Sequence, residues 1–374
     1  MALKFNKILI VRLSAIGDVI NTIPALVVLK HNFPLSHISW VVEDKAKDLL
    51  LGYPYLDNVF ILKRRSGNRI SRALSLIRKL RESKFDVAID FQGNLKSGLV
   101  ASLSGATTRI GIKPAKECNT LFTNYKINLP DQRMNRVERN LYILKSLGLD
   151  INILEWSKIP PPFTKPDELY IDKFLSVHNP QEKPVVILHP GTSEFGIFKR
   201  WHPQKYAQLA DRLIESLNIC CIISWSGKEK KLAESISARM KHKPLIIDEA
   251  ISINKFAALI KHALLFIGSD SAPLHLANLL GINIIGLYGP KDPIIYGPYS
   301  PATYPPEADL PMAQSSNQKT ASDKTRSTKP VIISAAQKGI SCSPCRKRKC
   351  NNPICMESIT VEEIFQQSST LLLK

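Results

Sequence analysis

The segment ILIVRLSAIGDVINTIPALVVLK, Ile8 to Lys30, decides the fold, because it joins an apolar strand to a helix through a short polar turn. This order of elements is typical of nucleotide-binding α/β proteins. The turn, however, contains Arg12, Ser14, a single Gly17 and Asp18, and it lacks the glycine-rich fingerprint of a phosphate loop. The aspartate in this turn therefore needs another explanation.

Strand-like and helical segments alternate along the rest of the chain. Strands are predicted at KILIVRL, ISWVVED and FDVAIDFQG in the first half, and at PVVILHPG, ICCIISWSG, LLFIGSD and INIIGLYGP in the second. Helices are predicted at DVINTIPALVVLKHNF, RALSLIRKLRES, HPQKYAQLADRLIESL, KEKKLAESISARM, NKFAALIKHA and SAPLHLANLLG. Apolar strands that alternate with helices indicate parallel sheets covered on both faces. The fold class is therefore α/β, with two Rossmann-like halves.

Changes in composition divide the chain. The proline-dense stretch from Glu155 to Tyr170 is typical of a linker, so residues 1–160 and 161–357 are predicted to form two domains. Residues 302–335 are rich in Ser, Thr, Pro and Lys and are predicted to form a mobile polar loop. Residues 358–374 are predicted to form a last helix, capped by Thr360 or Ser358.

The composition limits the class of partner. With 51 Lys and Arg against 32 Asp and Glu, the net charge is +19, which favours nucleic acid, an anionic membrane face or phosphorylated substrates. Aromatic residues make up only 7%, and no zinc-finger, RRM or KH signature is present, which argues against nucleic acid. No stretch reaches the ~18 apolar residues of a membrane span. Seven cysteines, an odd number, argue against a disulfide framework, so we expect a cytoplasmic protein.

Three polar loops follow predicted strands of the second half. In GSDSAPLHLANLLG, Asp270 and Ser271 stand at a helix start, where free amides attract phosphate, although either residue is equally compatible with a simple N-cap. His275 follows Ser271 by about one helical turn. HPGTSEFGIFKRW offers Thr192, Ser193, Lys199 and Arg200 to a diphosphate, or forms a solvated basic turn. SWSGKEKK adds Glu229, which can accept hydrogen bonds from a ribose. Loops after strand ends line one crevice in doubly wound sheets, so together they indicate a nucleotide-diphosphate site.

The loops of the first half are basic and polar. The candidates for binding a phosphorylated or anionic partner are Arg64, Arg65, Gln92, Asn94, Lys96, Lys113 and Arg136. Isolated basic residues are normally solvated surface, so the prediction depends on their density in loops and on the net charge.

Four cysteines near the C-terminus, Cys342, Cys345, Cys350 and Cys355, have the spacing C-x2-C-x4-C-x4-C. Four thiolates can bind zinc or an iron–sulfur cluster. The same segment is equally compatible with a basic surface turn that faces anions, and both interpretations stay open.

Five motifs occur in one order: ILIVRLSAIGDVINTIPAL, DFQGNLKSG, HPGTSEFGIFKRW, GSDSAPLHLANLLG and GLYGPKDP. In this order they resemble the ADP-heptose:lipopolysaccharide heptosyltransferases, glycosyltransferase family 9. The resemblance implies a GT-B fold, with two Rossmann-like domains facing a central cleft. It also implies that the first domain binds the acceptor, that the second binds the nucleotide sugar, and that the last helix packs back on the first domain.

The resemblance further implies an activity. It is the transfer of a heptose from ADP-heptose to the inner core of lipopolysaccharide, with inversion and with no metal or other cofactor. Asp18 matches the catalytic base. The matching donor-binding positions are Thr192, Ser193, Lys199, Glu229, Asp270, Ser271, Ala272 and His275. Some members have Thr-Thr and Asp-Thr-Gly where this chain has Thr192-Ser193 and Asp270-Ser271-Ala272.

The implied partners are ADP-heptose and a lipid A-linked core oligosaccharide, with peripheral contact at the inner face of the inner membrane and no nucleic acid. Two alternatives stay open: a related glycosyltransferase that uses another nucleotide sugar, and a non-catalytic nucleotide- or nucleic-acid-binding protein. By position alone, Asp18 also fits a helix N-terminal acid that interacts with the helix dipole. An oxidoreductase is disfavoured, because the chain lacks a G-x-G-x-x-G followed by an acid.

Overall fold

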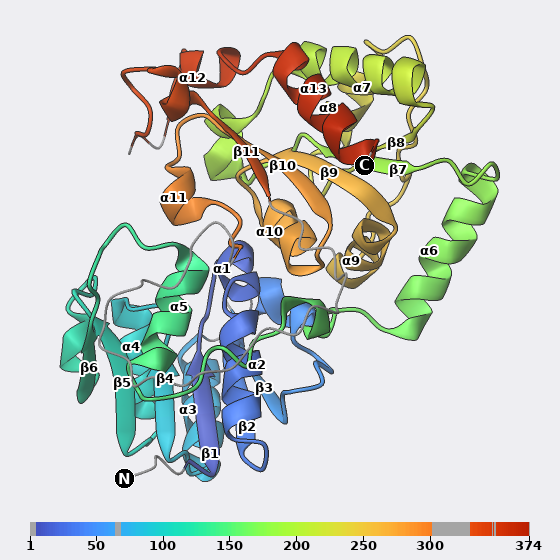
Figure 1. Cartoon of the computed structure of the whole chain (residues 1–374). Coiled ribbons are helices and arrows are strands. Elements are labelled where there is room, and N and C mark those ends of the chain that lie inside the picture. The colour runs from blue at the N-terminus through green and yellow to red at the C-terminus, as the bar shows by residue number, and fades with distance from the viewer. Residues whose placement is uncertain (1–4, 64–68, 301–329, 346, 348, 374) are drawn as a thin grey trace, which may run out of the picture.

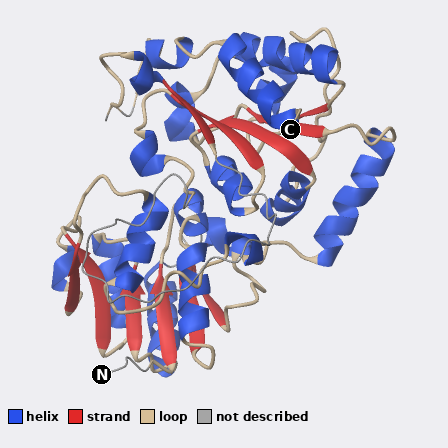
Figure 2. Cartoon of the chain, in the orientation of Figure 1, coloured by secondary structure: helices blue, strands red, loops and turns tan. Residues whose placement is uncertain are grey.

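The computed structural model describes residues 5–63, 69–300, 330–345, 347 and 349–373. Arg64, Arg65 and most of the predicted polar loop lie outside these residues. Two α/β domains are stacked one above the other, each with a sheet between layers of helices (Figures 1 and 2). This is the two-domain α/β fold that the sequence predicts. In the described part of the chain, no helix is both long enough and apolar enough to span a membrane.

The first domain contains a six-stranded parallel sheet in the order β3-β2-β1-β4-β5-β6. Its strands are β1 (Lys7–Val11), β2 (His37–Glu43), β3 (Asn58–Leu62), β4 (Val87–Asp90), β5 (Thr108–Lys113) and β6 (Tyr125–Asn128). Its helices are α1 (Ile16–Ile20), α2 (Ile23–Asn32), α3 (Arg69–Glu82), α4 (Leu95–Leu103) and α5 (Arg136–Lys145), and a 3-10 helix, η1 (Asp44–Leu49), follows β2. The central strand β1 is buried on both faces, with Ile8 and Ile10 in one core cluster and Leu9 and Val11 in another.

The second domain contains a five-stranded parallel sheet in the order β11-β10-β9-β7-β8. Its strands are β7 (Val185–His189), β8 (Cys220–Ile223), β9 (Ala263–Ser269), β10 (Asn283–Tyr288) and β11 (Val331–Ser334). Its helices are α6 (Lys165–His178), α7 (Pro203–Leu217), α8 (Lys230–Ser237), α9 (Ile253–Lys261), α10 (Ala272–Leu279), α11 (Pro293–Tyr296), α12 (Ile354–Glu357) and α13 (Val361–Leu372).

Three predicted boundaries are wrong. The first predicted helix is broken after Ile20, and α2 begins at Ile23 with Pro24 in its first turn. The predicted linker extends too far, because α6 begins at Lys165, where Pro166 suits a first helical turn and Thr164 forms a capping box with Asp167. The end of the predicted polar loop is β11, which pairs in parallel with β10 and forms the edge of the sheet.

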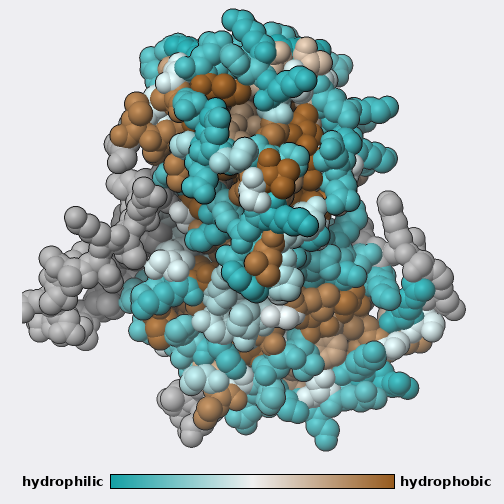
Figure 3. All heavy atoms as spheres, turned by 90° about the vertical axis from the view of Figure 1, so that its right-hand side faces the viewer, coloured by the Kyte–Doolittle hydropathy of each residue, from teal (hydrophilic) through white to brown (hydrophobic). Residues whose placement is uncertain are grey.

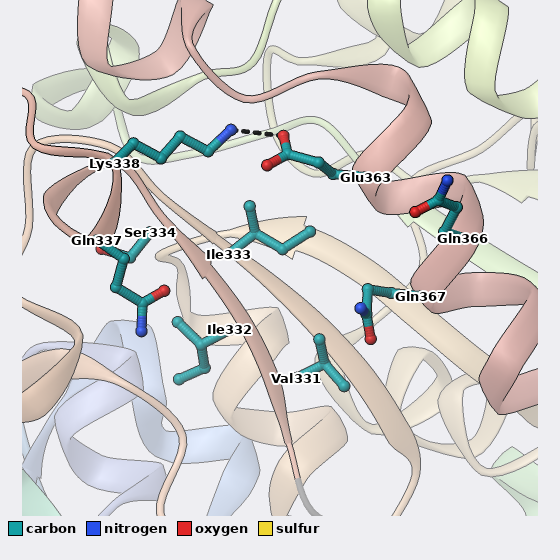
Figure 4. A pocket seen from close by; sticks show the side chains of 9 residues that line it. All are labelled: Val331, Ile332, Ile333, Ser334, Gln337, Lys338, Glu363, Gln366 and Gln367. Carbon is teal, nitrogen blue, oxygen red and sulfur yellow. Dashed lines mark hydrogen bonds and ion pairs between the residues drawn. The ribbon is translucent and has the colours of Figure 1, made fainter.

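The last helix does not pack as the resemblance implies. Its start is as predicted, since the Thr360 hydroxyl accepts a hydrogen bond from the Glu363 amide. Instead of returning to the first domain, α13 packs against α7, β9 and β10 of the second domain. The Arg212 guanidinium of α7 lies 4.0 Å from the centre of the Phe365 ring, and Ile364 is buried in the core of the second domain. Lys338, which follows β11, also pairs with Glu363 across a shallow pocket (Figure 4).

The two domains meet at helix starts. The short helix α1, which follows the central strand of the first domain, packs against α10 of the second domain (Figure 1). A second contact joins η1 to α9. Both α1 and α10 follow the carboxyl ends of parallel strands, so the functional loops of the two sheets face each other.

Candidate active site

Asp18 lies in the first turn of α1, beside the interface between the domains. Its Oδ2 atom is 2.7 Å from Nη2 of Arg12, and it accepts a longer hydrogen bond, 3.4 Å, from the amide of Ala15. The Asp18 side chain is 34% exposed, whereas that of Arg12 is buried. Asp18 therefore does accept a hydrogen bond from an amide at the start of α1, as its position predicts. Its carboxylate is nevertheless accessible and is paired with a buried cation.

The residues that follow β4 hold the turn between β1 and α1 through hydrogen bonds. Arg12 Nη1 and Arg139 Nη2 both donate to the carbonyl oxygen of Phe91, at 2.7 and 2.8 Å. The Gln92 side-chain oxygen accepts hydrogen bonds from the amides of Leu13 and Ser14, at 2.8 and 3.2 Å. The segment after β4 thus fixes the segment after β1, which carries Asp18.

Three arginines determine the charge state of Asp18. Burial alone would raise its pKa, but the positive charges of Arg12, Arg136 and Arg139, with the Ala15 amide, bring the pKa below its ordinary value. Conversely, burial and the charges of Arg12 and Arg136 lower the pKa of Arg139 to about 9. Asp18 is therefore ionised at neutral pH. Arg139, which follows Arg136 by about one helical turn on α5, is not among the predicted acceptor-binding residues.

Across the interface, Lys199 and Asp270 form the centre of the second domain's site. Lys199 Nζ lies 2.8 Å from both the backbone oxygen and Oδ2 of Asp270, which joins the loop after β7 to the loop after β9. His275 Nε2 is 3.9 Å from the other carboxylate oxygen of Asp270. Burial lowers the pKa of His275 despite the nearby Asp270 and Asp18, so the imidazole is neutral at pH 7.

Glu229 and Thr192 are joined through Arg200. Arg200 Nη2 lies 2.8 Å from Glu229 Oε1 and 3.0 Å from the Thr192 backbone oxygen, while its Nε donates to the Thr192 hydroxyl at 3.2 Å. Glu229 also lies against Gly191, where an added Cβ would be 2.2 Å from Oε2. Sequence reasoning took Arg200 for a free cationic donor, whereas the structure commits it to holding two of the predicted loops together.

The start of α10 has the features of an anion site. Ser271 occupies the N-cap position, yet its hydroxyl makes no capping hydrogen bond. Among the described residues, the buried Oγ of Ser271 and Nδ1 of His275 have no hydrogen-bond partner. Unpaired helix-start amides and polar atoms of this kind suit an anionic ligand. The structure therefore does not show the simple side-chain cap that was the alternative expectation for Ser271.

Gly17 brings the two halves into contact. A Cβ at Gly17 would lie 3.3 Å from Cδ2 of His275 and 3.5 Å from Cα of Ala272. The residue next to Asp18 therefore packs directly on the first turn of α10. Of the eight predicted donor-binding residues, Ser193 is exposed, Ala272 and His275 lie on α10, and the other five lie in the segments that follow β7, β8 and β9.

The predicted acceptor-binding residues separate into different roles. Gln92 holds backbone amides, and Asn94 caps α4 by accepting a hydrogen bond from the Ser97 amide. Lys96 pairs with the buried Glu43, and Lys113 is exposed at the end of β5. Arg136 is close enough to Asp18 to lower its pKa, and its guanidinium lies 4.9 Å from the ring centre of Tyr296 in the second domain. Among the predicted acceptor-binding residues that the structure describes, Arg136 is thus the one whose charge acts on Asp18.

The four C-terminal cysteines are not arranged as a metal centre. All four lie within the described residues and are free thiols, and no group of three or more His, Cys, Asp or Glu among those residues is placed to hold a metal ion. The segment instead contacts the loop after β10, since the amide of Cys345 donates to the Pro290 carbonyl oxygen at 2.8 Å. Packing explains the buried Cys355, which lies against Gly289.

Two facing α/β domains, one carrying an accessible carboxylate and the other loops that suit a diphosphate, define a glycosyltransferase of the GT-B type. The family model of glycosyltransferase family 9 (heptosyltransferase) matches residues 73–323, and the chain belongs to this family. The matched residues include the three loops of the second domain, and Asp18 precedes them.

Individual relatives agree with this assignment. The chain is 26% identical to lipopolysaccharide heptosyltransferase 3 of Escherichia coli over 285 residues, which are 74% of this chain and 82% of the relative. The fold is similar to that of a family 9 glycosyltransferase of Veillonella parvula, with a TM-score of 0.79, 21% identity and coverage of 100% and 99% of the two chains. It is also similar to E. coli heptosyltransferase WaaC with ADP, with a TM-score of 0.70, 18% identity and coverage of 98% and 99%.

Proposed function

We propose that this protein is an inverting, metal-independent heptosyltransferase that transfers a heptose from ADP-heptose to the inner core of lipopolysaccharide. One observation carries the proposal: the ionised carboxylate of Asp18 stands at the first turn of α1, which packs on the start of α10. The names of the relatives support the choice of acceptor, and the structure of WaaC with ADP supports the choice of nucleotide.

Asp18 serves as the general base. Inversion requires the acceptor hydroxyl to attack the anomeric carbon from the face opposite the leaving ADP. The hydroxyl becomes acidic as its bond to carbon forms, so a carboxylate of low pKa accepts the proton late in the step. Arg12 keeps Asp18 ionised and leaves part of the carboxylate exposed to the acceptor.

The second domain stabilises the leaving diphosphate. Negative charge grows on ADP as the bond between the anomeric carbon and the diphosphate breaks, and on this proposal Lys199 and the amides at the start of α10 stabilise that charge. Lys199 is held between the backbone and the carboxylate of Asp270, so it is already in place before the donor binds. Glu229, fixed by Arg200, is available to the ribose hydroxyls.

The basic surface of the first domain serves the acceptor. A lipid-linked core oligosaccharide carries phosphates and carboxylates, and Arg136 presents a cation beside Asp18. The net charge of +19 also favours contact with the inner face of the membrane, where anionic lipids are exposed. On this proposal the protein works in the cytoplasm, at the inner membrane.

The test is the variant Asp18→Asn, which keeps the shape of the side chain and removes the base. Transfer from ADP-heptose to heptose-deficient lipopolysaccharide should fall by about 10² to 10⁴, while calorimetry should show unchanged ADP-heptose binding. The exposed Asp150→Asn is the matched control and should transfer normally. Transfer by Asp18→Asn at the wild-type rate would exclude the base. If the protein transferred sugar only from a nucleotide sugar other than ADP-heptose, the proposed donor would be wrong. Loss of activity in EDTA would contradict metal independence.

A further inference from the structure

A groove lies at the outer edge of the first domain, between the edge strand β3 and helix α3. Its lining residues are Val59, Phe60, Ile61, Leu62, Lys63, Arg72, Ala73, Ser75, Leu76 and Lys79. Three of them are cations, most of the others are apolar, and this described lining contains no acid. We propose that this groove docks the protein on an anionic membrane by binding the phosphate headgroups of bilayer lipids.

The cations follow the length of the groove. Arg72 and Lys79 are seven residues apart on α3, so they lie on the same side of the helix, about 10 Å from one another along its axis. Lys63 comes directly after β3, at the other wall. Such a row can contact more than one headgroup at once, because long basic side chains extend their charge away from an apolar base.

The rest of α3 adds to the positive charge. The basic residues of the helix are Arg69, Arg72, Arg78, Lys79 and Arg81. The helix has one acid, Glu82, and this residue pairs with Arg78 on the same helix at 3.4 Å. A basic amphipathic helix of this kind is typical of proteins that lie on anionic membrane surfaces.

The strand provides the apolar part of the surface. Val59, Phe60, Ile61 and Leu62 are all partly exposed, although they form a strand. Figure 3 looks onto the side of the molecule that carries β3, and it shows apolar surface on the lower domain surrounded by hydrophilic residues. Apolar surface within a basic rim can enter the headgroup region while the cations bind phosphate.

The position of the groove links it to the active site. β3 is two strands away from β1 in a parallel sheet, so its carboxyl end lies about 10 Å along the same sheet edge from the turn that carries Asp18. A bilayer that contacts the mouth of the groove would hold a lipid-linked acceptor near that edge. The inference thus deepens the proposed function by naming the surface that faces the membrane.

A purely structural explanation makes a different prediction. Lysines beside an edge strand also prevent sheets from pairing edge to edge, and that role requires no lipid. It predicts that variants of the groove and of a distant basic surface bind anionic vesicles equally well. Because the whole chain carries a net charge of +19, the comparison of these variants separates the two explanations, whereas a wild-type preference for anionic vesicles alone does not.

The experiment is co-sedimentation of the full chain with vesicles of phosphatidylcholine alone or mixed three to one with phosphatidylglycerol, without nucleotide sugar or acceptor. Wild type should sediment with the anionic vesicles and stay in the supernatant with the neutral ones. A variant with Lys63, Arg72 and Lys79 changed to Gln should bind roughly a hundredfold more weakly, since each basic residue near an anionic surface contributes about a factor of five. Changing the exposed Lys173, Lys231 and Lys243 to Gln removes the same charge from the second domain and should have little effect.

Three outcomes would overturn the inference: no preference of wild type for anionic vesicles, full binding by the groove variant, or equal loss in both variants, which would mean that only total charge matters. Thermal unfolding checks that both variants fold, so that a loss of vesicle binding reports on the surface and not on folding. Because the vesicle experiment contains no donor, a negative result does not bear on the proposed heptosyl transfer. Likewise, normal transfer by Asp18→Asn would not change the vesicle-binding result.

Discussion

The guanidinium of Arg12 contacts Asp18 with one terminal nitrogen, at 2.7 Å, and the carbonyl oxygen of Phe91 with the other, at 2.7 Å. The carboxylate on α1 is thereby connected to the end of the neighbouring strand β4. Arg12 can therefore both orient Asp18 and keep it ionised. These two effects can be separated by substitution.

Arg12→Gln removes the charge and should raise the pKa of Asp18, because Arg12 is the strongest of the groups that lower it. The acid limb of the kcat/KM profile should therefore move to higher pH. Arg12→Lys keeps the charge but cannot make both contacts, so the acid limb should stay while the maximal rate falls. The exposed Lys145→Gln is the charge control. An acid limb that does not move in Arg12→Gln would show that Arg12 does not set the protonation of the base.

Lys199→Met should lower kcat more than it raises KM, because the charge it stabilises develops as ADP leaves. We expect a loss of about 10² to 10³ in kcat, the range for removing one such donor. Lys228 lies in the next loop and is 92% exposed, so Lys228→Met should stay within twofold of wild type. Steady-state kinetics at saturating acceptor measures both constants. A change in KM alone would show that Lys199 contributes to substrate binding and not to stabilisation of the transition state.

Gly191→Ala should weaken nucleotide binding without preventing folding. The added Cβ would lie 2.2 Å from Oε2 and 2.5 Å from Cδ of Glu229, so Glu229 must leave Arg200. We expect ADP to bind about ten- to a hundredfold more weakly in calorimetry, since one charge-assisted hydrogen bond contributes about 1.5–3 kcal/mol. Shortening the partner, in Gly191→Ala with Glu229→Asp, should recover part of the affinity. Unchanged ADP binding by the single variant would remove Glu229 from the donor site.

The central strands could be predicted from sequence because their physical signal is strong. β1, β7 and β9 are continuous apolar runs, as burial on both faces requires. β6 was missed because three of its four residues are exposed, and β11 was missed because it follows a long polar stretch. Edge strands need only one apolar face, so their sequences resemble loops.

The sequence predicts which loops form the site, but it does not predict the contacts between their side chains. The residue types at Asp270 and Glu229 indicate a polar crevice, yet their pairing with Lys199 and Arg200 depends on how three separate loops pack. Gln92 shows the opposite error: an amide in a loop suggests a ligand contact, whereas here its oxygen satisfies two backbone amides. Sequence patterns do not distinguish a side chain that binds a ligand from one that supports the backbone.

Asp90 offers a test of how the turn carrying Asp18 is supported. It is fully buried and accepts hydrogen bonds from the amides of Gln92 and Gly93, the Ser97 hydroxyl and the Asn119 side chain. Asp90→Ala would leave the amides of Gln92 and Gly93 without this acceptor, whereas the Ser97 hydroxyl and the Asn119 side chain would keep the carbonyl oxygen of Asn94. We expect the free energy of unfolding to fall by about 3 kcal/mol or more, because each such group costs about 1–3 kcal/mol. The exposed Asp131→Ala should cost less than about 1 kcal/mol.

The same residue predicts a pH dependence of stability. Burial, opposed by these hydrogen bonds, raises the pKa of Asp90 above its ordinary value. The folded state then holds the proton more tightly than the unfolded chain. Its contribution to stability is therefore complete below the ordinary aspartate pKa and is lost as pH rises through the raised value. Urea unfolding across that range should show a wild-type slope that Asp90→Ala lacks and Asp131→Ala retains. If the two variants gave the same slope, Asp90 would be ionised in the fold, with its four donors compensating the buried charge.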